Sequence, residues 1–221
     1  MKQFLLASFI LLINNMATLG QAIPTPKNYS TINTALGDLD KDGIEELVVA
    51  YDTKKADEEY ESVPRELIIY KKQNNKWTVW KKSSQALLGS REGGMMGDPF
   101  GELKIKNGIL HISHDGGSSW KWSHTDKYRY SNGEFDLIGY SSIYGKLCEY
   151  WEKVDFNLAT GKISVEKEYE DCDTSDQAIY KRENETFYKK GIKINLQNRK
   201  DREIKIVTPK YRHEIYIAVK D

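Results

Sequence analysis

Acidic side chains alternate with other residues in the run GDLDKDGIEEL, and this spacing is typical of a loop that binds a metal ion. A hard cation such as Ca²⁺ takes roughly six to eight oxygen ligands, so a short loop must aim alternate carboxylates inward and then turn sharply. Gly43 can make that turn without steric cost, although Asp and Gly also favour turns that hold no metal. The pattern predicts a calcium site with carboxylate ligands from Asp38, Asp40, Asp42 and Glu46 and a carbonyl ligand from Ile44.

The residues after this loop favour a strand rather than a helix, because ELVVAY is rich in β-branched side chains. In a helix-loop-helix calcium site the last ligand would fall on Val49, which has no side-chain oxygen. The run DLDKDGIEELVVA instead resembles the calcium-bearing hairpin of FG-GAP and VCBS-type repeats, found in integrin-like β-propellers and many secreted bacterial proteins. The resemblance implies oxygen ligands at the first, third, fifth and ninth loop positions. These are Asp38, Asp40, Asp42 and Glu46, where the family usually has Asp at the ninth position.

The sequence holds one good copy of this motif. A second run, NLQNRKDREIKIV from Asn195, lacks both the acidic alternation and the glycine. A β-propeller needs several such units, so a blade-like sheet is the better prediction. The stretch GDPFGELKIKNGILHISHDGGSSWKWSHTDKYRY also resembles a set of uncharacterised secreted bacterial proteins, and that likeness implies no activity.

Residues Trp120, Trp122, His124 and Asp126 alternate along one predicted strand and would share a face. A carboxylate can fix the tautomer of an imidazole, so His124 and Asp126 are the candidate catalytic residues if the chain is an enzyme. No nucleophile accompanies them, and a structural His–Asp pair is the competing interpretation. Trp120, Trp122 and His124 could equally bind a sugar or peptide by stacking, or pack in the core.

A zinc site is the other interpretation of this region, because three of the four histidines fall between residues 111 and 124. Strand geometry argues against it, since His111 and His114 point to opposite faces. We expect DGGSS to form a three-residue loop, which puts the tryptophans on the face of Leu110 and Ile112. In that register His114 and His124 share a face but lie four residues apart, about 13 Å.

Local turn signals set the register of several hairpins. Asn107 and Gly108 predict a type I′ turn that pairs Ile105 with Leu110, and a second Asn-Gly turn at 132–133 predicts that Tyr130 pairs with Phe135. Further along, a three-residue turn at 159–161 would bring Cys148 opposite Cys172. The sequence therefore predicts a disulfide between these two cysteines.

The N-terminus reads as a secretory signal, residues 1–22, with Lys2, an apolar run from Phe4 to Ile13 and a small-residue cleavage site ending at Ala22. An apolar run of this length is too short to span a membrane. The chain has equal numbers of basic and acidic residues, 33 of each, which argues against a nucleic-acid partner. We expect a secreted or periplasmic monomer with no membrane span after signal removal.

Strand-like runs separated by turns fill the rest of the chain, and no linker divides it. The sequence predicts a single all-β domain at residues 23–221, an antiparallel meander of about 10 to 12 strands. Its first four strands, between residues 31 and 81, would form the blade-like sheet. A β-sandwich and a small incomplete propeller are the alternatives.

The function expected from these features is a secreted, calcium-stabilised module that binds an envelope, carbohydrate or protein ligand and catalyses no reaction. The alternative is a secreted hydrolase that acts on polysaccharide or peptidoglycan. A glycosidase would normally need two positioned carboxyl groups, and the sequence does not nominate a pair.

Overall fold

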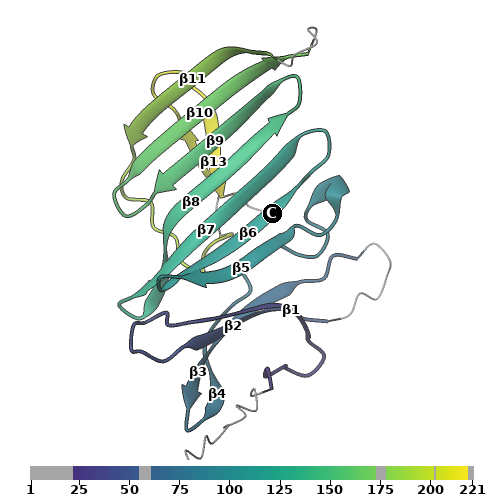
Figure 1. Ribbon diagram of the computed structural model, residues 1–221, viewed down its shortest axis with the longest axis vertical. Helices are drawn as coiled ribbons and strands as arrows, with labels where there is room; N and C mark the ends of the chain where they lie inside the picture. Colours follow the sequence, from purple (N-terminus) through teal and green to yellow (C-terminus); the bar gives the residue numbers. More distant parts are fainter. Residues whose placement is uncertain (1–21, 55–60, 173–177, 202, 219–221) are drawn as a thin grey trace, which may run out of the picture.

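The computed structural model of the chain describes residues 22–54, 61–172, 178–201 and 203–218. The predicted signal segment lies outside these residues except for Ala22. The described residues form antiparallel β-sheets and no α-helix, so the predicted all-β fold class is confirmed (Figure 1). No helix in this part of the chain is long and apolar enough to cross a membrane.

The first four strands form one sheet in sequence order, which confirms the predicted blade-like sheet. They are β1 (Ser30–Gly37), β2 (Glu46–Asp52), β3 (Arg65–Gln73) and β4 (Lys76–Ser83). Strand β2 reads as a continuous apolar run because both of its faces are covered. Val48 and Ala50 pack into the main core, whereas Val49 and Tyr51 pack into a second cluster on the opposite face.

The next seven strands form a second antiparallel meander in which each strand pairs with its sequence neighbours. They are β5 (Phe100–Lys106), β6 (Ile109–Gly117), β7 (Lys121–Ser131), β8 (Glu134–Lys146), β9 (Tyr150–Asn157), β10 (Lys162–Asp171) and β11 (Ala178–Tyr188). Both predicted Asn-Gly turns are confirmed, since Ile105 pairs with Leu110 and Tyr130 pairs with Phe135. At each turn Asn and Gly both have positive φ, as a type I′ turn requires.

The turn between β6 and β7 has the predicted length of three residues, but its position differs from the prediction. It runs from Ser118 to Trp120 rather than within DGGSS, so Trp120 lies in the turn and not in the strand. Trp122 pairs with Gly116 across it and lies on the face that carries Leu110 and Ile112. We call this core-bearing face of the seven-stranded sheet its inner face.

The expected separation of His114 and His124 is wrong. The two residues pair directly across β6 and β7, with ring centroids 5.2 Å apart rather than about 13 Å. Gly117 pairs with Lys121 at the mouth of the turn, and counting away from that pair brings the two histidines opposite each other.

A disulfide joins Cys148 and Cys172, as predicted, with their Cα atoms 5.2 Å apart. The strand register beneath it differs by one residue from the prediction, because Lys162 pairs with Asn157 across a turn at Leu158–Gly161. Both cysteines lie beyond the ends of β9 and β10, and Cys148 has a φ of 65°. The irregular backbone there absorbs the difference of one residue.

The C-terminal residues cross the inner face of the seven-stranded sheet. They form a two-stranded sheet of β12 (Ile204–Val207) and β13 (Glu214–Ala218), seen in yellow behind β8 and β9 in Figure 1. Ile215 and Ile217 alternate with polar or exposed residues along β13 and are buried in the main core. Strand β11 was not predicted, because its run of charged residues gives no apolar alternation.

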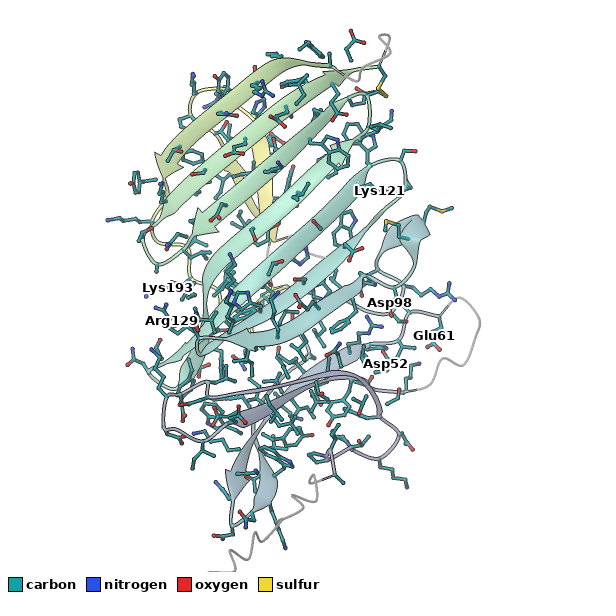
Figure 2. The ribbon with its side chains drawn as sticks, in the orientation of Figure 1. Asp52, Glu61, Asp98, Lys121, Arg129 and Lys193 are labelled. Atoms are coloured by element: carbon teal, nitrogen blue, oxygen red, sulfur yellow. A yellow bond between two sulfur atoms is a disulfide. The ribbon has the colours of Figure 1, made fainter. Side chains whose placement is uncertain are left out.

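Arg65 connects the two large sheets. It lies in β3 with 3% of its surface exposed and donates to Asp52 at 2.9 Å and to both oxygens of Asp98 at 2.7 and 2.6 Å. Asp98 precedes β5, and Figure 2 places it beside Asp52 where the two sheets meet. A bidentate pair of this kind fixes both distance and orientation.

Candidate functional site

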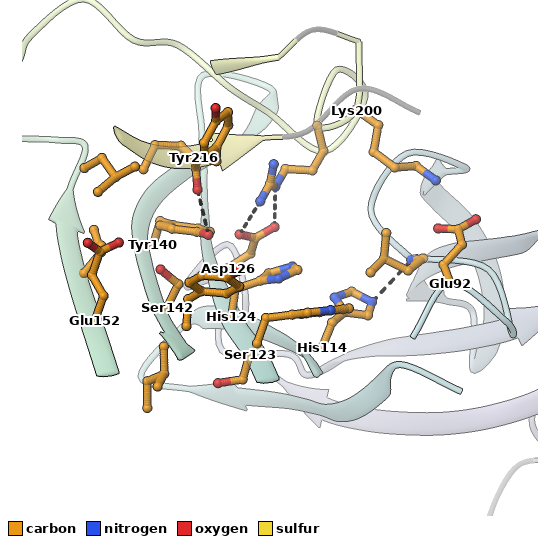
Figure 3. Close-up of a pocket in the computed structure, with 18 of the residues that line it drawn as sticks. Glu92, His114, Ser123, His124, Asp126, Tyr140, Ser142, Glu152, Lys200 and Tyr216 are labelled. Carbon is orange, nitrogen blue, oxygen red and sulfur yellow. Dashed lines mark hydrogen bonds and ion pairs between the residues drawn. The ribbon is translucent and has the colours of Figure 1, made fainter. Parts of the chain in front are cut away.

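A cavity of about 810 Å³ lies between the inner face and the segments that cross it. Strands β6 to β10 supply one side, and residues 85–88, residues 199–200 and β13 supply others. This volume falls within the usual range of ligand pockets, roughly 300 to 1,000 Å³. Two of the three predicted ligand-binding residues, Trp122 and His124, line the cavity. Figure 3 shows His124 among the lining residues.

Three aromatic rings from β7 and β8 form a stepped stack along the cavity, which we call the aromatic wall. The ring centroid of Trp122 lies 5.8 Å from that of His124 with 17° between the planes, and His124 lies 5.9 Å from Tyr140 with 26° between the planes. Tyr140 also donates a hydrogen bond to the carbonyl of Tyr216 in β13 at 3.2 Å. The wall therefore touches the segment that closes the cavity.

Gly116 allows Trp122 to lie across β6. A Cβ on Gly116 would come within 2.6 Å of Trp122 Cζ2 and within 2.6 Å of the Gly93 carbonyl oxygen. Gly117 donates to that carbonyl at 2.8 Å. The Gly-rich run before β5, residues 89–97, is thus packed against β6 through Gly93.

Asp126 and Arg199 form a buried ion pair at the cavity. Arg199 donates to Oδ2 at 2.5 Å and to Oδ1 at 3.1 Å, and Tyr128 donates to Oδ2 at 3.0 Å. Burial alone would raise the pKa of Asp126, but the guanidinium of Arg199 lowers it below its ordinary value. Asp126 is therefore held by Arg199 and Tyr128, and it does not act as a dedicated hydrogen-bond partner of His124.

A second ion pair lies further along the inner face. Lys167 in β10 lies 3.6 Å from Glu152 in β9, and each side chain is 10% exposed. The Lys167 ammonium also lies 3.6 Å from the ring centroid of Tyr150, within range of a cation–π interaction. Burial raises the pKa of Glu152, although the charge of Lys167 opposes that shift.

Both histidines of the cavity are neutral. His114 is 2% exposed, and its Nε2 accepts a hydrogen bond from the Leu88 amide at 3.3 Å. Burial lowers the pKa of His114 to about 3 and that of His124 to about 4. In the part of the chain that the structure describes, three potential metal ligands come close together only at Asp38, Asp40 and Asp42. Within that part, the histidines belong to no such group, so the zinc interpretation gains no support.

Trp120 occupies a different place from Trp122. It lies in the turn after β6, is half-buried, and is not among the residues that line the cavity. Its ring stacks on Tyr144 with centroids 5.3 Å apart and 11° between the planes, and it also contacts Tyr150 at 5.1 Å. The predicted pair of tryptophans is therefore divided between the cavity and the surface beside it.

The acidic loop brings three of its predicted ligands together. One oxygen each from Asp38, Asp40 and Asp42 lies within 4.8 Å of the others. Oδ1 of Asp38 and Oδ1 of Asp40 are buried and accept no hydrogen bond. Glu46 is not in this group, and its Oε2 accepts a hydrogen bond from the Leu39 amide at 2.7 Å.

The ammonium of Lys71 lies inside this acidic loop. It contacts Asp40 directly and lies 3.6 Å from Asp42 and 3.8 Å from Glu46. It also lies 4.3 Å from the ring centroid of Trp80, which packs on Phe135 of the seven-stranded sheet at 5.3 Å. The loop is thus linked to the junction between the two large sheets. The Ile44 amide donates to Asp42 at 2.8 Å, and the Ile44 side chain is exposed.

Several residues of the site were not predicted. Arg199 lies in a segment with no regular pattern, so the sequence gives no sign that it reaches Asp126, 73 positions away. Glu152 and Lys167 did carry a signal, because each occupies an inward position in a strand that otherwise alternates apolar and polar residues.

Comparison with models of known protein families gives no match for this chain, and comparison with curated proteins gives none either.

Removing one partner of the Asp126–Arg199 pair leaves the other charge buried without a counter-ion. We expect Arg199→Met to lower the free energy of unfolding, measured by urea denaturation, by about 3 to 5 kcal/mol. The exposed pair of Arg182 and Glu168 provides the control, because Arg182→Met should cost less than about 1 kcal/mol. Equal stability of the Arg199→Met variant and the parent would contradict the structural role given to this pair.

The neutral histidines should make the fold sensitive to acid. In the unfolded chain both titrate near pH 6.5, whereas in the folded chain the pKa values are about 3 for His114 and about 4 for His124. Below pH 6.5 the unfolded state therefore binds more protons than the folded state. The free energy of unfolding should fall as the pH falls toward 4, by up to about 1.4 kcal/mol per pH unit for each histidine. Denaturation at a series of pH values should show a shallower slope for His114→Gln, and an unchanged slope would count against a buried neutral His114.

Proposed function

We propose that this chain is a secreted, calcium-stabilised module that binds a carbohydrate in the cavity and catalyses no reaction. The observation that carries the proposal is the aromatic wall inside a cavity of about 810 Å³. Ligand pockets are mostly apolar, with a few placed polar groups that fix orientation. The apolar face of a sugar ring packs on aromatic rings, while its hydroxyl groups need donors and acceptors at the edge.

The polar residues around the wall suit a ligand with many hydroxyl groups. Ser142 pairs with His124 and lines the cavity beside it, and Glu152 and Lys167 offer an acceptor and donors close by. Both histidines are neutral, and the Asp126 and Arg199 charges cancel each other. These features favour an uncharged ligand such as a glycan over an ionic one.

The geometry gives the hydrolase alternative little support. Its predicted His124–Asp126 pair would need the carboxylate to orient the imidazole, but both Asp126 oxygens accept from Arg199. Glu152, the other buried carboxyl group of the cavity, is paired with Lys167. A glycosidase needs one carboxyl group as an acid and a second as a base or nucleophile. Binding without turnover is the better-supported function.

Export fits the disulfide, since such bonds persist in oxidising compartments outside the cytosol. Calcium would have a structural role in this proposal. Asp38 and Asp40 each hold a buried oxygen with no hydrogen-bond partner, and oxygen atoms of this kind are the ligands that Ca²⁺ prefers. The loop adjoins the junction of the two sheets, so a bound ion would stabilise that junction.

Calcium should raise the thermal stability of the protein. At ten times its dissociation constant, an ion that binds the folded state alone adds about 1.4 kcal/mol to the free energy of unfolding. Asp40→Ala should abolish the effect, measured as a shift in melting temperature. Lys71→Met should tighten binding in a calorimetric titration, because the competing ammonium is removed from the loop. The absence of binding at millimolar calcium, or an Asp40→Ala variant that binds like the parent, would refute the site.

Trp122 should be needed for ligand binding more than for folding. We expect Trp122→Ala to weaken calorimetric binding of neutral β-1,4-linked glucose or N-acetylglucosamine trimers by at least about tenfold, because aromatic anchors dominate such contacts. Trp77→Ala is the matched control, since Trp77 packs against the second cluster of the four-stranded sheet. That variant should lower stability and leave binding unchanged. Trimer binding that survives Trp122→Ala would place the ligand elsewhere.

A further inference from the structure

A row of aromatic residues continues from the cavity across the inner face toward the edge strand β11. Successive ring centroids lie 6.3 Å apart for Tyr144 and Tyr150, 5.9 Å for Tyr150 and Tyr169, and 6.1 Å for Tyr169 and Tyr180. These residues come from β8, β9, β10 and β11 in turn. Neighbouring strands are about 4.8 Å apart, so a ligand that touches every ring must lie across the strands.

The row is continuous with the cavity and opens to solvent. Tyr144 and Tyr150 line the cavity, whereas Tyr169 and Tyr180 are not among its lining residues. Exposure reaches 41% at Tyr144 and 65% at Tyr180. Trp120 widens the row on one side by stacking on Tyr144. Large exposed aromatic side chains in a contiguous line mark an interaction surface.

The charged residues between the rings are paired with one another. Lys167 pairs with Glu152 at 3.6 Å, and Lys181 pairs with Glu183 at 2.6 Å. Glu183 also contacts Nε2 of His213 at 2.7 Å. Each pair places hydrogen-bond donors beside an acceptor, which suits a ligand rich in hydroxyl groups. Because each pair joins one positive and one negative charge, the two pairs leave no net charge beside the rings, and this favours an uncharged ligand.

We propose that this row is an extended subsite and that the ligand is a neutral oligosaccharide of several sugar units. One end occupies the cavity against the aromatic wall, and the following units pack on Tyr150, Tyr169 and Tyr180. This inference rests on the proposed function, because it assigns a length and a charge to the ligand of the same site.

The test is a calorimetric titration of the parent protein with neutral β-1,4-linked glucose oligomers and N-acetylglucosamine oligomers, each of two to six units. In at least one series the six-unit oligomer should bind at least about tenfold more tightly than the two-unit one. Tyr180→Ala should remove most of this gain and leave two-unit binding unchanged. Tyr188→Ala is the matched control, because Tyr188 is equally exposed at the other end of β11 and should leave both affinities unchanged.

The outcomes separate the two proposals. Equal affinities for short and long oligomers would overturn the extended subsite and leave cavity binding intact. A length dependence that Tyr180→Ala does not reduce would likewise place the added units elsewhere. Tighter binding of an acidic oligogalacturonate than of the neutral oligomers would overturn the assignment of charge. If no oligomer of either neutral series binds, both the extended subsite and the carbohydrate function are wrong.

Discussion

The buried contact between Asp126 and Arg199 determines where the C-terminal segment crosses the seven-stranded sheet. Residues 189–201 form no regular strand and attach to β8 through backbone bonds at Leu137 and Phe135, so the guanidinium supplies a specific anchor for them. A buried ion pair adds little net stability compared with apolar packing, but a misplaced one is costly. The pair therefore specifies one arrangement of β12 and β13 over the inner face, and the cavity is the space left beneath them.

Along β9 and β10 the side chains on the inner face change from apolar to charged and then to aromatic. On β9 and β10 the buried residues Phe156 and Ile163 give way to the Glu152–Lys167 pair and then to Tyr150 and Tyr169. The β12–β13 hairpin covers the apolar end, whereas the aromatic end stays open. A single sheet thus supplies both a core and a binding surface, because its length exceeds what the hairpin covers.

The hairpins could be predicted because their signals are local. Asn107 and Asn132 fix their turns within two residues, and alternation along each strand then determines which side chains face inward. The contact of Arg199 with Asp126 could not be predicted, since it depends on how two distant segments pack. To predict that His114 pairs with His124, one must know which residues begin and end the turn between β6 and β7, and the sequence leaves this ambiguous. The acidic loop was recognisable from spacing alone, but the ammonium of Lys71 enters it from another strand.

Strand β11 is an open edge of the larger sheet, and its composition bears on self-association. An unpaired edge is a template on which another chain can add a strand, and natural proteins discourage this with charged side chains. Lys181, Arg182, Glu183 and Glu185 stand in the middle of β11, so an incoming strand would have to strip water from ionised groups. Loss of those charges would leave Tyr180 and Phe187 on a bare edge, a surface prone to fibrillar growth.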